Sequence, residues 1–188
     1  MSAYALNLDA LGGLDEAHFV QLCRDNPDLK LERTAGGELI VMAPTGGETG
    51  RFNAEILADL VNWNRRTDLG FCFDSSTGFH LPNGADRSPD VAWVEKSRWL
   101  ALSPQQRERF APIAPDFVVE LRSPSDDLSA LQAKLREYLD SGVRLVWLLD
   151  RPGRRVEIHR SGQAVDIRPA PVVLSGETVL PGFELRFD

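Results

Sequence analysis

The clearest pattern of apolar and polar positions lies in the stretch that ends at Asp150. Residues 116–122 form a short apolar run that ends in turn residues, and residues 144–150 form a second apolar run. Between them, residues 127–141 carry apolar side chains at helical spacing and stop at Gly142. A strand, a helix and a strand of these lengths predict a βαβ unit with two parallel strands and a right-handed crossover.

The rest of the pattern predicts both helices and hairpins. Helical spacing predicts helices at 14–26 and 48–66. A turn-rich connection at 82–89 leads into a short strand at 90–94. Further extended segments are predicted at 29–33, 38–42, 70–81, 155–160, 164–168, 172–174 and 183–187. The chain shows no repeat and no linker, so we expect residues 1–188 to form a single domain.

Glu120 stands out because it lies inside the first apolar run, between Val119 and Leu121. Such a run is typical of a strand buried on both faces, where an unpaired carboxylate is costly. Glu120 must therefore be neutral, paired or bound to a metal. Strand periodicity puts Arg122 on the same face. One interpretation is a structural ion pair between Glu120 and Arg122, and the other is an active site at the carboxyl end of a central strand.

Composition indicates a globular protein rather than a membrane protein. Apolar residues make up 43% of the 188 residues, and no run approaches the ~18 apolar residues of a membrane helix. The first residues lack a basic segment followed by an apolar one, so we expect no signal peptide. Cys23 and Cys72 lie far apart without metal-ligand spacing, which favours reduced thiols and a cytoplasmic location. His18, His80 and His159 are scattered, which gives a zinc site or a Ser/His/Asp triad little support.

The net charge of −7 argues against a general nucleic-acid coat protein, because Lys and Arg carry phosphate binding. The charge does not exclude a nuclease. A carboxylate-rich site that holds divalent cations, together with a local basic patch, can act on DNA despite an acidic total.

Two acids are candidates for a metal site. Asp90 opens a predicted strand, and Glu120 lies on a neighbouring one. Mg²⁺ prefers oxygen ligands and usually takes one or two carboxylates, so these two side chains could supply the pair. A bound cation would also offset the cost of burying Glu120. Taken alone, Asp90 is also compatible with a simple turn residue. Glu55 lies at the rim of the apolar stripe of its predicted helix, where a solvated position is the default.

Two cations are candidates for the same site. Lys134 flanks the apolar stripe of the helix at 127–141, so its long stem could reach the carboxyl edge of the sheet. An ordinary surface lysine is the alternative. Arg122 competes for the role of stabilising charge on a phosphate, but arginine cannot act as a base. Asp126 and Asp127, at the start of the helix, are expected to cap it.

Three segments together resemble a known family. The segments SPDVAWV at 88–94, PDFVVELRSPSDD at 115–127 and KLREYLDSGVRLVWLLD at 134–150 are similar to the Uma family of endonucleases. That family belongs to the PD-(D/E)xK, or restriction-endonuclease-like, superfamily. The resemblance covers most of the chain, including the Pro-Gly-hydrophobic stretch at 181–183.

The resemblance implies an α/β fold with a central mixed sheet flanked by helices, additional hairpins and Mg²⁺-dependent phosphodiester hydrolysis. Asp90 matches the aspartate of the PD motif, Glu120 matches the second acid, and Glu55 matches an acid on the first core helix. The superfamily expects lysine two residues after Glu120, where this chain has Arg122. Lys134 resembles the relocated lysine of members that lack the strand lysine.

Three hypotheses follow. The first is an endodeoxyribonuclease in which Asp90, Glu120 and Glu55 hold Mg²⁺ or Mn²⁺, with Lys134 and Arg122 as catalytic cations. The second is a weakened or inactive nuclease-fold protein that acts as a nucleic-acid-binding or regulatory module, which Arg122 and the acidic charge favour. The third is a carboxylate-pair hydrolase such as a glycosidase, which ranks last because nothing indicates a sugar site. DNA is the expected partner, and a homodimer would allow both strands to be cut.

Overall fold

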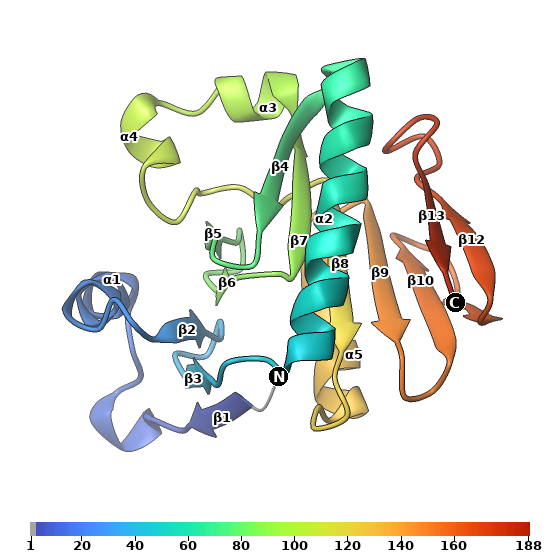
Figure 1. The fold of residues 1–188 in the computed structure, drawn as a ribbon. Coiled ribbons are helices and arrows are strands. Elements are labelled where there is room, and N and C mark those ends of the chain that lie inside the picture. The colour runs from blue at the N-terminus through green and yellow to red at the C-terminus, as the bar shows by residue number, and fades with distance from the viewer. Residues whose placement is uncertain (1–2) are drawn as a thin grey trace.

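The computed structural model describes residues 3–188, and its largest sheet is a six-stranded mixed one (Figure 1). The strand order is β11-β10-β9-β8-β7-β4. These strands are β4 (Gly70–Asp74), β7 (Val91–Glu95), β8 (Phe117–Arg122), β9 (Leu145–Asp150), β10 (Arg155–Arg160) and β11 (Asp166–Pro169). Only the β8–β9 pair of this described sheet is parallel; its other neighbours are antiparallel. The expected mixed sheet is confirmed.

The predicted βαβ unit forms the centre of this sheet. Helix α5 (Leu128–Asp140) crosses from β8 to β9. The register pairs Phe117 with Leu145 and Arg122 with Asp150, so both strands end at the same edge. Asp127 caps α5 as predicted, because its Oδ1 accepts a hydrogen bond from the Ala130 amide at 2.9 Å.

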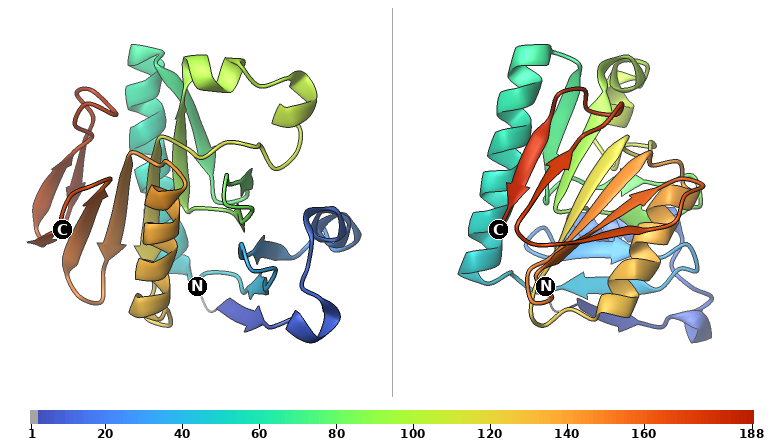
Figure 2. Two further views of the ribbon diagram at one scale, coloured as in Figure 1. Left: turned by 180° about the vertical axis from the view of Figure 1, so that it is seen from behind. Right: turned by 90° about the vertical axis from the view of Figure 1, so that its right-hand side faces the viewer.

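Helices cover both faces of the sheet, as the side view in Figure 2 shows. Helix α2 (Gly47–Thr67) packs on one face through an apolar stripe that includes Ile56 and Leu60. The hairpin of β12 (Val172–Ser175) and β13 (Glu184–Phe187) closes the same core. Helix α5 packs on the other face through Leu135 and Tyr138. Because β-strand side chains alternate, Val119 and Leu121 join the α2 core while Glu120 faces α5.

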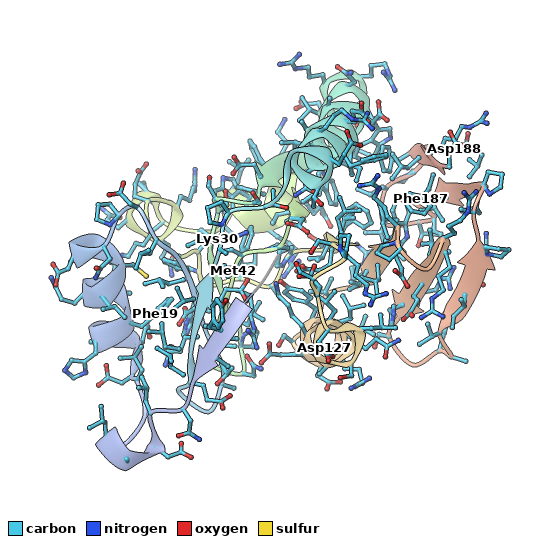
Figure 3. The ribbon with its side chains drawn as sticks, turned by 60° about the horizontal axis from the view of Figure 1, so that its bottom comes forward. Phe19, Lys30, Met42, Asp127, Phe187 and Asp188 are labelled. Atoms are coloured by element: carbon cyan, nitrogen blue, oxygen red, sulfur yellow. The ribbon has the colours of Figure 1, made fainter. Side chains whose placement is uncertain are left out.

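A second sheet forms the N-terminal part of the protein. Its strand order is β1-β3-β2-β6-β5. The strands are β1 (Ala3–Leu6), β2 (Lys30–Arg33), β3 (Leu39–Met42), β5 (Phe79–His80) and β6 (Asp86–Arg87). The short helix η1 (Asp9–Leu11) precedes α1 (Glu16–Asp25), and α1 packs on the sheet through Phe19, which Figure 3 labels. Two further short helices, α3 (Lys96–Leu100) and α4 (Pro104–Arg107), follow β7.

The sequence pattern missed some of these strands for physical reasons. The segment at 70–81 divides into β4 and β5, because the Asp74 side chain accepts a hydrogen bond from the Ser76 amide and forms a turn. The predicted connection at 82–89 contains β6, whose residues Asp86 and Arg87 are charged yet buried. Long-range ion pairs permit this burial, and local periodicity carries no sign of them. Strand β1 was not predicted.

Within residues 3–188, no helix combines the length and the apolar character needed to cross a membrane.

Candidate active site

A cavity of about 850 Å³ lies where the N-terminal sheet meets β8 and α5. Figure 3 shows two of its lining residues, Met42 on β3 and Asp127 at the start of α5. Most charged side chains in the lining are acidic. They are Glu32, Glu38, Asp90, Glu120, Asp126, Asp127 and Glu137, with Arg87 and Lys134 as the cations. The cavity therefore collects negative charge at the carboxyl edge of the central strands.

Asp90 lies directly before β7 and is held against β8. Its Oδ2 accepts a hydrogen bond from the Leu121 amide at 2.9 Å. Its Oδ1 accepts one from Asn53 Nδ2 at 3.1 Å, which links it to α2. Because Leu121 follows Glu120, the structure brings the two acids together as the sequence predicted.

Glu120 is the buried carboxylate that the sequence singled out. The residue is 4% exposed. Its Oε1 accepts a hydrogen bond from Tyr138 Oη at 3.0 Å and lies 2.8 Å from Lys134 Nζ. Burial raises the pKa of Glu120 to about 7; the charges of Asp90 and Glu32 add to the rise, and Lys134 opposes it. This carboxyl therefore ionises reluctantly without a further cation.

Lys134 reaches the sheet edge from α5, where the sequence placed it. Its Nζ lies 2.8 Å from Glu120 Oε1 and 3.0 Å from Glu32 Oε1. Burial opposes the charged form, but the carboxylates of Glu120 and Glu32 outweigh burial and hold the pKa of Lys134 above its ordinary value. Lys134 is thus a fixed cation and not a base.

Arg122 does not form the ion pair with Glu120 that strand periodicity allowed. Its Nη1 lies 3.0 Å from Asp150 Oδ1. The parallel register explains the choice of partner, because it places Asp150 directly opposite Arg122 at the end of β9. The guanidinium also donates to the carbonyl oxygen of Asp126. Arg122 therefore ties β8 to β9 and to the turn before α5.

Glu55, the third expected ligand, does not line this cavity with Asp90 and Glu120. Its side chain is 55% exposed and its Oε1 lies 2.6 Å from Arg51 Nη1. Asn53 is the residue of α2 that contacts Asp90. Two positions along a helix turn the side chain by about 200°, so Asn53 and Glu55 point in nearly opposite directions.

Glu32 is the site residue that sequence reasoning missed. It is 2% exposed and lies on β2. Its Oε1 also accepts a hydrogen bond from the Ser88 amide at 2.9 Å, and its Oε2 lies 3.1 Å from Arg87 Nη1. Burial opposes ionisation, but Lys134 and Arg87 outweigh it and lower the pKa of Glu32. In the sequence, Glu32 is one charged residue on a short strand, and no local signal shows its distant partners.

The donor atoms in the cavity fit a divalent cation. Within the described residues, no three His, Cys, Asp or Glu side chains are grouped as a complete metal site. Mg²⁺ needs fewer, because it usually takes one or two carboxylates and completes its shell with water. Asp90 and Glu120 supply two. Asn53 Oδ1 is a buried oxygen without a hydrogen-bond partner among residues 3–188, which adds a neutral acceptor beside Asp90.

The chain is similar to one known protein family. The Uma2 family model, described as "Putative restriction endonuclease", matches residues 16–188. The chain belongs to the Uma2 family. The matched region contains Asp90, Glu120 and Lys134.

The same fold is also found among solved structures. A crystal structure from Anabaena variabilis, described as a "putative nuclease", superposes with a TM-score of 0.72 at 18% sequence identity. The match covers 83% of this chain and 86% of that one. At this identity the likeness shows the fold. No curated protein matches the chain.

Proposed function

We propose that this protein is an endonuclease that uses Mg²⁺ or Mn²⁺ to hydrolyse phosphodiester bonds in DNA. The observation that carries the proposal is the placement of Asp90, Glu120 and Lys134 around one cavity at the carboxyl edge of β8. Family membership and a nuclease-like fold support the reaction class.

Each residue has a distinct task in this proposal. Asp90 and Glu120 would hold the cation, which would supply Lewis acidity and lower the pKa of water. Asn53 and the Leu121 amide fix the two oxygens of Asp90. Lys134 donates hydrogen bonds to a phosphate oxygen and stabilises the negative charge that develops there. Its raised pKa suits this task, because the ammonium remains charged at neutral pH.

Plasmid cleavage with Mg²⁺ or Mn²⁺ tests the proposal. We expect Asp90→Asn and Glu120→Gln each to slow cleavage by about 100-fold or more, because each removes a carboxylate that would hold the cation. Glu55→Gln is the matched control, since its exposed carboxylate is paired with Arg51, and it should cleave at the rate of the unchanged protein. Equal activity of all three variants would contradict the assignment.

A weakened nuclease-fold protein that binds nucleic acid is the second candidate. The observation that favours it is Arg122, which stands two residues after Glu120 and is engaged with Asp150. Calorimetry separates the two candidate functions. An enzyme should bind Mn²⁺ through Asp90 and Glu120. A binding protein should need no cation, and its DNA affinity should be unchanged in Asp90→Asn.

Assembly and location are part of the same proposal. A homodimer would present two cavities to the two strands of a duplex, and analytical ultracentrifugation tests for it. The free thiols Cys23 and Cys72 fit a reducing cytoplasm.

A further inference from the structure

Lys134 is shared between two carboxylates that differ in their surroundings. Its Nζ lies at nearly equal distances from Glu120 and Glu32. Glu120 belongs to the candidate metal pair. Glu32 instead pairs with two cations, Arg87 and Lys134, and also accepts a hydrogen bond from the Ser88 amide. The charge of Glu32 is thus compensated by two protein cations. Glu120 pairs with Lys134 and accepts from the neutral Tyr138 hydroxyl, so it is the better partner for a divalent cation.

This sharing affects cation binding at Glu120. Two cations on one carboxylate repel each other, and the repulsion is strong in a buried site of low effective dielectric constant. If Glu120 were its only carboxylate partner, the Lys134 ammonium would remain on Glu120 and compete with the metal for that carboxylate. Glu32 offers Lys134 a second anionic partner, on a strand of the other sheet.

We propose that Glu32 is a positioning residue that retains Lys134 when a divalent cation occupies Asp90 and Glu120. The inference rests on the proposed function, because it concerns the same cation site. In this arrangement Glu32 keeps the ammonium at the cavity and out of competition with the metal. Glu32 itself takes no part in metal coordination.

A double-mutant cycle separates this role from a general effect of charge. Glu32→Gln also removes one negative charge near the site, which alone weakens cation binding whether or not Lys134 is present. Competition by Lys134 requires the ammonium. We therefore compare Glu32→Gln in the unchanged chain with Glu32→Gln in a Lys134→Met chain, measuring Mn²⁺ affinity by isothermal titration calorimetry.

We expect Glu32→Gln to weaken Mn²⁺ binding about tenfold more when Lys134 is present than in the Lys134→Met chain, where only the general effect of charge remains. Glu137→Gln is the matched control. It removes a carboxylate that lines the same cavity and pairs with Arg87. It should change the affinity by less than about twofold. Equal weakening in both backgrounds, or no weakening at all, would overturn the proposal.

A crystal structure of the unchanged protein with Mn²⁺ gives a second measurement that does not depend on how a variant folds. We expect Lys134 Nζ to remain within hydrogen-bond distance of Glu32 while its distance from Glu120 increases. Loss of the Glu32 contact would overturn the inference alone. Absence of Mn²⁺ binding in the unchanged protein would overturn the metal-dependent function as well.

Discussion

At the scale of single residues, burying the Glu120 carboxyl at the cavity costs folding free energy. Glu120 is buried, and its pKa of about 7 means that the folded state holds its proton more tightly than the unfolded chain does. In the absence of metal, stability from this group therefore rises as pH falls from about 7 toward the ordinary carboxyl range. Above pH 7 the ionised carboxylate opposes folding. A site that awaits a cation commonly carries such a cost.

Glu120→Gln should therefore stabilise the metal-free protein at high pH. We expect a gain of roughly 1–3 kcal/mol in the free energy of unfolding at pH 8 and a much smaller gain at pH 5, where Glu120 is protonated in the folded state. Urea unfolding in the presence of a chelator measures it, with Glu55→Gln as an exposed control. A less stable Glu120→Gln protein at pH 8 would show that Lys134 fully compensates the buried charge.

At the scale of elements, one side chain connects α2 to the central sheet. Asn64 donates to the Gly70 carbonyl at 2.8 Å and accepts from the Gly70 amide at 3.1 Å. Its Oδ1 also accepts from Trp93 Nε1 at 2.9 Å. Helix α2 is thereby held to β4 and β7, and the same helix carries Asn53 to Asp90. The orientation of Asn53 at the candidate site thus depends on a contact three turns away.

Asn64→Ala should destabilise the fold by about 2–3 kcal/mol, because it leaves the indole of Trp93 and the backbone of Gly70 without these partners. Thermal unfolding checks the loss. The matched control is Asn62→Ala, an exposed position on the same helix, which should unfold near the temperature of the unchanged protein. Equal effects of both substitutions would contradict this role for Asn64.

At the scale of the whole molecule, DNA must approach an acidic protein. Arginines gather near the start of α2: Arg51 and Arg151 lie over the ring of Phe52, 4.4 and 4.0 Å from its centroid. Arg154 is exposed in the turn between β9 and β10. Figure 1 shows this turn, the start of α2 and the end of β8 at the same end of the molecule. We expect phosphates to bind here.

Replacing Arg151 and Arg154 together with Ala should weaken DNA binding and reduce the slope of log affinity against log salt by about 1–2, since each lost phosphate contact lowers the slope by about 0.9. Fluorescence anisotropy of labelled DNA, with Ca²⁺ in place of Mg²⁺, measures this affinity at each salt concentration. The control replaces Arg24 and Arg109, which are exposed on the side of α1 and α4. An equal loss in the control would indicate a nonspecific charge effect.

Sequence reasoning succeeded where the signal is local. The β8–α5–β9 unit, the position of Asp90 and the reach of Lys134 follow from periodicity and from segments that resemble the family. It failed where partners are distant, because Glu32 lies 102 residues from Lys134. For Arg122 the same-face argument was sound, but the register between β8 and β9 supplied a better partner in Asp150. Glu55 points away from the site because two positions along α2 turn the side chain by about 200° from that of Asn53.

The ion pairs that connect β2 to the segment before Asp90 also limit how this protein can be engineered. Glu32 and Arg33 of β2 pair with Arg87 and Asp86 of β6, and these pairs are buried. A chain shortened to begin at α2 would retain Asp90, Glu120 and Lys134 and yet expose Arg87 and leave Lys134 with one carboxylate. An engineered version that replaces the N-terminal sheet should therefore replace α5 with it, because the two elements share these contacts.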